Sequence, residues 1–314
     1  MRKKIVKILK WFIFTLAILT IGGLLYAGNY FYEYAVIPSE KDFLSSDTET
    51  KTTETQKIED WYTNDKNREQ WTLYSKDGLK LSAFFLPTEK SEGKTAILAH
   101  GYMDTAETMA EYAKMYHDMG YNVLVPDARG HGNSEGDYIG FGWHERKDYL
   151  QWIDQILQKQ GDQEKITLYG VSMGAATVMM VSGEKLPENV VSIVEDCGYT
   201  SVEEELTYQL KDQFDLPAFP MIPITSLVTK IRAGYFFNEA DASKQLAKNT
   251  RPIFFIHGKK DKFVPFSMLD ELYQATNAPK EKWAVNNAAH ADSYNQDPDL
   301  YQDKVHTFLE KYDK

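Results

Sequence analysis

Cysteine is nearly absent from this chain of 314 residues, in which Cys197 is the only one. A single thiol excludes a disulfide framework within the chain and any zinc site built on several thiolates. Basic residues are also in deficit, since 35 Lys and Arg stand against 46 Asp and Glu and the net charge is −11. Such an acidic protein is a poor binder of polyanions, so we expect no nucleic-acid partner.

Charge is missing altogether from residues 11–32, although five basic residues precede them. A helix over about residues 8–26 would be ~28 Å long, close to the thickness of the bilayer hydrocarbon. The run has no polar face with which a soluble helix could meet water. We therefore expect residues 1–34 to form a short cytoplasmic stub and a transmembrane helix that anchors the protein.

The charges on the two sides of this run predict its orientation. Basic residues lie only before it, and Glu33, Glu40 and Asp42 follow it. Residues 1–28 hold five bases and no acid, so the remainder carries a net charge of −16 against −11 for the whole chain. The positive-inside rule then predicts a single-pass protein of the cell membrane with its body outside the cytoplasm. A cleaved secretory signal is the alternative, but Tyr26-Ala27-Gly28 is a poor cleavage site.

A polar segment separates the expected anchor from the body. Residues 45–57 are rich in Ser, Thr, Glu and Lys and show no apolar periodicity. This composition is typical of a solvated spacer or of the polar start of a helix. We expect a spacer over residues 35–68 and one large domain over residues 69–314.

From about residue 69 the chain alternates short apolar runs with helical patterns. Lys76-Asp77-Gly78 indicates a hairpin between two early strands, Asp104 to Glu107 resembles a capping box, and Gly120 is a helix stop. Asp297-Pro298 is typical of a helix start. Repeated β-then-α units predict a mostly parallel sheet with helices on both faces. We expect strands over 70–75, 79–86, 95–99, 121–126, 165–169, 190–195, 253–257 and 281–285, with helices over 143–160 and 172–185 among others.

The alternation breaks between about residues 200 and 248. This stretch predicts two or three helices, punctuated by Pro217, Pro220 and Pro223, inserted over the carboxyl edge of the sheet as a cap. Its apolar side chains favour either a hydrophobic acyl or aromatic pocket or a core internal to the cap, and the sequence does not decide between them. They are Phe214, Leu216, Phe219, Met221, Ile222, Phe236 and Phe237.

One motif indicates chemistry. Gly170-Val171-Ser172-Met173-Gly174 fits G-x-S-x-G, and it stands between a predicted strand and a predicted helix. A sharp turn there would expose the hydroxyl of Ser172, while the two glycines let neighbouring backbone approach. The helix N-terminus would add a positive dipole and free N–H groups. We therefore predict that Ser172 is a nucleophile.

A serine hydroxyl needs a base, and that base needs a group to orient it. In this kind of turn the order along the chain is Ser, then Asp or Glu, then His. Three histidines follow Ser172, namely His257, His290 and His306. His257 ends a predicted strand and His306 lies on the polar side of the final helix. His290 lies in a loop after the last predicted strand, so it is our candidate base.

The orienting acid should follow the preceding strand. Asp261 lies four residues after His257, in a loop, and is the first candidate. Asp196 ends the strand before and is the alternative, although we expect it to hold the loop at residues 197–199. Two backbone N–H groups should stabilise the oxyanion, those of Met173 and Tyr102. His100 is predicted to be a structural hydrogen bonder.

Five segments together carry a resemblance. In order they are HGYMD, DARGHGNSEG, GVSMG, HGKKDKFVP and AAHADS. Over roughly residues 70–312 the chain resembles the alpha/beta-hydrolase superfamily, and most of all bacterial membrane-anchored members related to serine aminopeptidase, monoacylglycerol lipase and cinnamoyl esterase types. The resemblance implies an esterase-type hydrolase with Ser172, Asp261 and His290 as its triad. The Arg129-Gly130-His131 stretch is usually architectural in this superfamily.

These inferences predict a serine hydrolase that cleaves a small-molecule ester through an acyl-enzyme intermediate, without metal or cofactor. The same triad could instead hydrolyse an aminoacyl or peptide bond, or transfer an acyl group. A membrane-anchored binding protein without activity is the remaining alternative. The sequence leaves the substrate and the oligomeric state open.

Overall fold

The computed structural model of the chain describes residues 2–39, 53–64, 66 and 68–312. Within these residues the centre is an eight-stranded sheet of order β1-β2-β4-β3-β5-β6-β7-β8. β2 pairs antiparallel with β1 and with β4, and every other neighbour is parallel, which confirms the mostly parallel sheet. The strands are β1 (Glu69–Tyr74), β2 (Lys80–Leu86), β3 (Lys94–Ala99), β4 (Asn122–Pro126), β5 (Lys165–Val171), β6 (Val190–Asp196), β7 (Ile253–Gly258) and β8 (Lys280–Val285).

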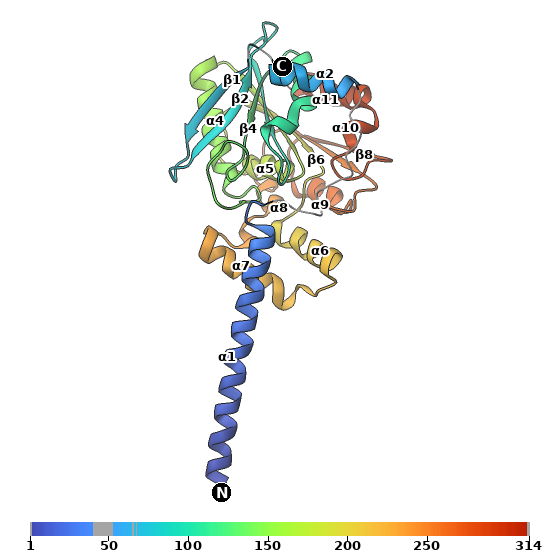
Figure 1. Cartoon of the computed structure of the whole chain (residues 1–314). Coiled ribbons are helices and arrows are strands. Elements are labelled where there is room, and N and C mark those ends of the chain that lie inside the picture. Colours follow the sequence, from blue (N-terminus) through green and yellow to red (C-terminus); the bar gives the residue numbers. More distant parts are fainter. Residues whose placement is uncertain (1, 40–52, 65, 67, 313–314) are drawn as a thin grey trace.

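Helices cover both faces of the sheet, as expected (Figure 1). Side chains alternate across the strands, so Ile97 joins one apolar core while its neighbours Ala96 and Leu98 join the other. The helices that pack on the first core include α4 (Glu145–Gln160), α5 (Met173–Ser182), α8 (Ala242–Leu246) and α9 (Met268–Ala275). The end of the N-terminal helix and the helices over residues 202–214 and 218–233 also contribute side chains to it. The helices that pack on the second core include α2 (Thr53–Asn64), α3 (Ala110–Asp118) and α11 (Pro298–Tyr312).

Two of the three predicted helix signals are confirmed. The side chain of Asp297 accepts a hydrogen bond from the backbone N–H of Leu300 at the start of α11. Gly120 has a φ of +85° just after α3, the left-handed conformation of a helix stop. The capping box at Asp104 is wrong. The segment begins as a 3-10 turn over Ala106–Met109, and its cap residue Thr105 makes no side-chain capping hydrogen bond.

The N-terminal helix α1 (Arg2–Ala35) is 34 residues long, or ~51 Å, and ends one residue beyond the expected stub and anchor over residues 1–34. It projects from the body as a single rod (Figure 1). Residues 3–23 are exposed, whereas from Gly28 onward the helix packs on α7 (Ala218–Ala233). A Cβ on Gly28 would lie 3.1 Å from the carbonyl oxygen of Ile224, which shows how closely the two backbones approach. By length and composition α1 could cross a membrane.

The segment expected to be a spacer is in part packed against the body. Of residues 45–57, those up to 52 lie outside the described residues, and α2 begins at Thr53. α2 contacts α3, and its buried Tyr62 donates a hydrogen bond to the carbonyl of Ala106, 2.8 Å away. After α1, Val36 is fully buried and its carbonyl accepts a hydrogen bond from Ile139. The body therefore directly contacts the end of α1.

Residues 200–248 contain the predicted helices. They are α6 (Val202–Phe214), α7, a short 3-10 turn (Phe237–Glu239) and α8. α6 and α7 lie between the sheet and the exposed rod of α1 (Figure 1). Pro223 does not punctuate them as expected, because it lies inside α7. Phe219 has a non-helical ψ of 130°, so regular helix begins after it, and Pro223 falls in the first turn where an N–H is not needed.

Candidate active site

Ser172 occupies the turn between β5 and α5. Its φ of 56° and ψ of −119° are rare for a residue with a side chain, which indicates a strained turn held by its surroundings. The two flanking glycines have a steric cause: a Cβ on Gly170 would collide with the backbone of Gly174, and one on Gly174 would collide with that of Ala99. The backbone N–H of Ser172 donates to the carbonyl of Asp196, 2.8 Å away, which ties the turn to β6.

The structure brings the predicted nucleophile, base and acid together. Ser172 Oγ lies 2.8 Å from His290 Nε2, although the two residues are 118 positions apart. His290 lies between β8 and α10 (Ser293–Gln296). Its Nδ1 atom lies 2.8 Å from Oδ2 of Asp261, which follows β7. The imidazole of His290 is therefore bonded to a hydroxyl on one side and to a carboxylate on the other.

The environment of Asp261 keeps its carboxyl ionised. Its Oδ1 atom accepts hydrogen bonds from the backbone N–H groups of Phe263 and Val264, both 2.9 Å away. Burial alone would raise the pKa of this carboxyl, but hydrogen bonds from His257 and His290, together with their charges, lower it to about 2. At neutral pH the carboxylate of Asp261 can therefore accept a hydrogen bond from the Nδ1–H of His290, which fixes the orientation of the His290 ring.

The alternative acid, Asp196, bonds to other partners. Its two oxygens accept hydrogen bonds from Ser293 at 3.0 Å and from Tyr301 at 2.9 Å. Burial raises the pKa of Asp196 to about 6. The side chain thus holds α10 and α11 against β6, rather than the loop at residues 197–199 that we expected it to hold.

His257 contacts Asp261, and the sequence alone does not reveal this contact. It lies wholly buried beside Asp261, with its Nε2 atom 3.2 Å from the Asp261 Oδ2 atom. Burial would lower the pKa of His257, but the hydrogen bond to Asp261 and nearby acidic groups raise it overall. Its Nδ1 atom and Oε1 of Glu195 are both buried without a hydrogen-bond partner among the described residues. Burial raises the pKa of Glu195 to about 8.

The two predicted oxyanion donors lie beside Ser172. Met173 is the first residue of α5, where a backbone N–H has no partner within the helix. A Cβ on Gly101 would lie 3.7 Å from the Cβ of Ser172, so the loop that carries the N–H of Tyr102 passes next to the nucleophile. The phenol of Tyr102 donates to the carbonyl of Ala35, 2.8 Å away, at the end of α1.

His100 has the structural role that the sequence predicts. Its Nε2 atom accepts a hydrogen bond from the N–H of Ala128 at 2.9 Å, and its Nδ1 atom lies 2.8 Å from the carbonyl of Gly101. Burial lowers the pKa of His100 to about 3, so the ring is neutral and can both accept and donate. It joins the loop after β3 to the loop after β4.

One group among the described residues has the composition of a metal site. Ligand atoms of Cys197, Asp261 and His290 lie within 4.8 Å of one another. Asp261 and His290 are hydrogen-bonded to each other, and burial raises the pKa of the Cys197 thiol well above its ordinary value. Because a thiolate and not a thiol binds metal, a buried neutral thiol makes this group a poor ligand set.

Comparison with known proteins identifies the family. The family model described as serine aminopeptidase, S33, matches residues 91–197. The uncharacterized protein YqkD of Bacillus subtilis (strain 168) is 31% identical over 216 residues, which are 69% of this chain and 71% of YqkD. The chain belongs to the alpha/beta-hydrolase superfamily. The uncharacterized membrane protein YNL320W of Saccharomyces cerevisiae is 24% identical to this hydrolase over 243 residues, 77% of this chain and 79% of that protein.

Solved structures have the same fold. The Pyrococcus furiosus esterase Pf2001 matches with a TM-score of 0.66 at 21% identity, covering 88% of this chain and 97% of that one. The alpha/beta hydrolase GrgF from Penicillium sp. sh18 matches with a TM-score of 0.62 at 14% identity, covering 78% and 98%. At these identities the likeness shows the alpha/beta-hydrolase fold alone.

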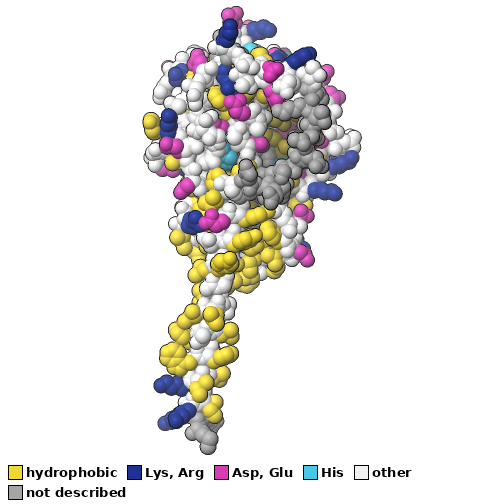
Figure 2. Space-filling view, viewed as in Figure 1, with side chains coloured by type: hydrophobic (Ala, Val, Ile, Leu, Met, Phe, Trp, Pro, Cys, Tyr) yellow, Lys and Arg dark blue, Asp and Glu magenta, His cyan; other side chains and the backbone are white. Residues whose placement is uncertain are grey.

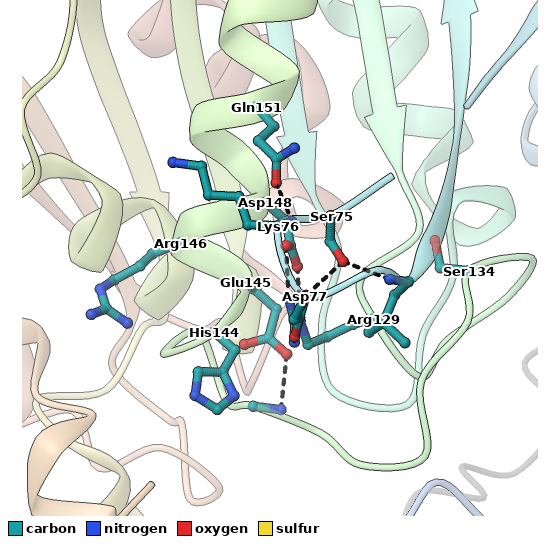
Figure 3. Close-up of polar contacts among 12 residues, drawn as sticks. Ser75, Lys76, Asp77, Arg129, Ser134, His144, Glu145, Arg146, Asp148 and Gln151 are labelled. Atoms are coloured by element: carbon teal, nitrogen blue, oxygen red, sulfur yellow. Dashed lines mark hydrogen bonds and ion pairs between the residues drawn. The ribbon is translucent and has the colours of Figure 1, made fainter. Parts of the chain in front are cut away.

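The Arg129 stretch of this hydrolase is architectural, as the resemblance implies. The guanidinium of Arg129 donates to both oxygens of Asp148 at 2.7 and 2.8 Å and to Asp77 at 2.8 Å (Figure 3). Burial raises the pKa of Asp148 to about 6, although the hydrogen bonds from Arg129 act to lower it. His131 accepts a hydrogen bond from the N–H of Met103 at 3.3 Å. The network thus joins the loop after β4 to α4, to the β1–β2 hairpin and to the loop beside Ser172.

An apolar pocket begins at Ser172. It has a volume of about 780 Å³ with the open solvent at its mouth included, and α6 and α7 form much of its wall. Its lining includes four of the apolar residues noted in the sequence, which are Phe214, Met221, Ile222 and Phe237. Phe219 and Phe236 instead point outward, with 78% and 37% of their surface exposed. The cap thus contributes both to a pocket and to an apolar outer surface.

A second pocket lies on the other side of the nucleophile. It has a volume of about 770 Å³ on the same measure, and its lining is mixed, with polar groups from Thr108, Glu111 and Asn295 beside apolar side chains such as Met109 and Phe263. Ser172 and Tyr102 line both pockets. A substrate bound at Ser172 would therefore have access to an apolar pocket and to one of mixed polarity.

Proposed function

We propose that this hydrolase cleaves carboxylic esters through an acyl-enzyme intermediate, with Ser172 as nucleophile, His290 as base and Asp261 as the group that orients His290. The observation that carries the proposal is the unbroken series of hydrogen bonds from Ser172 Oγ through the His290 ring to Asp261, each 2.8 Å long. A nucleophile, a base and an orienting carboxylate in hydrogen-bond reach form the arrangement that activates a serine.

The carboxylate sets the tautomer of the base. Because Asp261 is ionised at neutral pH, His290 donates its Nδ1–H to it, which leaves the Nε2 lone pair facing the hydroxyl of Ser172. As Oγ attacks the ester carbonyl, its proton passes to Nε2, and the negative charge of Asp261 stabilises the imidazolium that forms. His290 then returns the proton to the leaving alkoxide oxygen when the ester C–O bond breaks.

The oxygen of the attacked carbonyl becomes negative in this step. The backbone N–H groups of Met173 and Tyr102 would donate hydrogen bonds to it, and the N-terminus of α5 would add its positive dipole. In the second half of the reaction a water molecule replaces the alcohol. His290 takes the proton of that water, the hydroxide attacks the acyl carbonyl, and Ser172 leaves with the proton restored to Oγ.

The lining of the apolar pocket supports an ester with an apolar acyl chain. Glu205 is the acidic residue in its lining, and burial raises the pKa of Glu205 to about 8. A neutral Glu205 leaves this pocket without a fixed charge, whereas Asp104 and Glu111 line the second pocket at Ser172. Acyl transfer remains compatible with the same acyl-enzyme, since an alcohol or amine could then take the place of water.

We also propose that α1 anchors the hydrolase in the cell membrane, with the basic N-terminus in the cytoplasm and the catalytic body outside. The length and composition of α1 and the basic residues at its start support this orientation. Residues from Gly28 onward pack on α7, so one continuous helix would join the membrane span to the body.

A substrate panel tests the proposal. Full-length protein in detergent would be assayed with 4-nitrophenyl esters of short to long acyl chains, a feruloyl ester and aminoacyl anilides. We expect hydrolysis of esters, no hydrolysis of the anilides, and loss of ester hydrolysis in Ser172→Ala. Anilide hydrolysis that depends on Ser172 would favour the aminoacyl alternative, and an inert wild type that still binds ligand would favour a binding protein.

A further inference from the structure

The outer surface of the cap is apolar where α1 leaves the body. Phe219 and Ile231 of α7 are 78% and 75% exposed, and Leu227 on the same helix is 40% exposed. None of these three side chains lines the pocket beside Ser172. Figure 2 shows hydrophobic side chains gathered on the lower part of the body, directly above the exposed rod. Exposed apolar surface of this kind marks a contact with a membrane or another apolar partner.

The contacts of α7 place this surface at the end of the apolar run of α1. Arg232, the residue after Ile231, donates to Asn29 at 2.8 Å and forms an ion pair with Glu33. The uncharged run begins at residue 11, and a span of ~30 Å at ~1.5 Å per residue ends near residue 30. The C-terminal end of α7, which carries Ile231, thus lies level with the outer boundary of the hydrocarbon.

The same end of α1 forms part of the pocket wall. Phe31, Tyr34 and Ala35 line the pocket together with α6 and α7. The ring of Phe31 packs edge-on against that of Phe214, with 5.3 Å between centroids, and Tyr34 donates to Gln213 at 2.7 Å. A helix that spans the bilayer is therefore continuous with a wall of the pocket that begins at Ser172.

We propose that the outer face of the cap lies in the membrane interface, and that the pocket receives the acyl chain of a membrane-dissolved long-chain ester directly from the bilayer. The proposal rests on the esterase activity and the anchor proposed above. Three observations carry it: the apolar outer face of α7, its level on α1, and the α1 residues in the pocket. Since the second pocket at Ser172 has a larger share of polar groups than the first, it would hold the alcohol part of the ester.

Position in the bilayer can be measured without reference to activity. Ile231→Cys in the full chain would be labelled with an environment-sensitive fluorophore, and Cys197 would not react because it is fully buried. In vesicles of phosphatidylcholine and phosphatidylglycerol, we expect a blue-shifted emission that brominated lipid quenches. The matched control is Tyr74→Cys, on the edge strand β1, where the native side chain is 69% exposed and no quenching is expected. An unquenched label at position 231 would overturn the proposal.

Activity provides the second test. Full-length protein in the same vesicles would hydrolyse 4-nitrophenyl palmitate dissolved in the bilayer and 4-nitrophenyl butyrate from water. For Phe219→Ser/Ile231→Ser we expect about a tenfold loss with palmitate, equivalent to ~1.4 kcal/mol, and unchanged hydrolysis of butyrate. Tyr74→Ser should match the wild type with both esters. Equal rates with palmitate in the wild type and the double variant would overturn the proposal.

Variants of α1 distinguish its role in the pocket wall from its role as a membrane anchor. Phe31→Ala should lower kcat/KM for palmitate relative to butyrate, because it removes a pocket side chain. Tyr26→Ala, at a position of the same helix that is 77% exposed, should leave this ratio unchanged. An unchanged palmitate-to-butyrate ratio in Phe31→Ala would contradict a role for α1 in the wall. A wild type that hydrolyses neither ester would instead overturn the proposed esterase activity itself.

Discussion

The Nε2 atom of His257 lies 3.2 Å from Oδ2 of Asp261, the same oxygen that accepts the hydrogen bond from His290. The second oxygen of Asp261 is occupied by the N–H groups of Phe263 and Val264. One carboxylate thus contacts two histidines and two backbone amides. These contacts fix the plane of the carboxylate, and through it the direction of the His290 ring.

We therefore predict that His257 is a positioning residue. His257→Phe should lower kcat by about tenfold with little change in KM, because a hydrogen bond to a charged group contributes ~1.5–3 kcal/mol. His257→Gln, which retains an N–H donor, should recover part of this loss. Steady-state kinetics on a soluble short-chain ester would measure both, and a wild-type kcat in the Phe variant would contradict the role.

The two buried aspartates should respond differently to the same change. Asp261→Asn should lose most of kcat, by about 10³–10⁴-fold, with little change in KM, because the amide favours the wrong tautomer of His290. Asp196→Asn should mainly lower the melting temperature, because Ser293 and Tyr301 each donate to a different oxygen of Asp196 and the amide nitrogen that replaces one oxygen cannot accept. If the two outcomes were exchanged, Asp196 would be the orienting acid.

The buried carboxyl of Glu195 should make the stability of the protein depend on pH. Burial raises the pKa of Glu195 to about 8, above the model-peptide value of 4.5. Its contribution to stability is therefore fully present below about pH 4.5 and is lost as the pH rises through 8. Glu195→Gln stays neutral, so its melting temperature should fall less than that of the wild type between pH 6 and 9. Glu203→Gln, on the exposed side of α6, should follow the wild type, and parallel curves for all three proteins would contradict the prediction.

Topology can be tested in intact cells. Protease added to bacterial protoplasts that express the full chain should digest the hydrolase body and leave a short stub in the membrane fraction. Complete protection would refute the orientation. Release of the body into the medium with a new N-terminus near residue 28 would replace the anchor with a cleaved signal.

Much of the fold follows from local sequence pattern. The buried strands read as short apolar runs, and most of the strands and helices predicted by range begin and end within three residues of the observed bounds. The prediction of a capping box at Asp104 fails because a pattern of only four residues is weak evidence. In the structure the loop after β3 passes beside Ser172 before the helix begins. Local propensity yields there to the packing around the nucleophile.

The predicted triad residues could be chosen from chain order alone. The rule that a serine, an acid and a histidine follow one another in this kind of turn selects Asp261 and His290 as candidates, and both lie in loops after parallel strands. The contact of His257 with Asp261 has no such signal, because a histidine at the end of a buried strand is compatible with many structural roles. Only the folded structure of the loop after β7 shows that His257 contacts the carboxylate of Asp261.

The role of α1 could not be predicted for a different reason. Its composition indicates a membrane span, and composition is blind to long-range contacts. The pocket wall depends on Phe31 and Tyr34 meeting Phe214 and Gln213, about 180 residues later in the chain. Nothing in the local pattern of residues 28–35 distinguishes a helix end in solvent from one packed on a cap.

Covalent labelling of Ser172 tests the central claim most directly. Full-length wild type treated with a fluorophosphonate should gain the mass of one phosphonyl adduct, and peptide mass spectrometry should locate that adduct on Ser172. Ser172→Ala should remain unlabelled while keeping the melting temperature of a folded protein. Labelling that persists in Ser172→Ala, or an adduct on any other residue of the wild type, would contradict a serine hydrolase built on Ser172, His290 and Asp261.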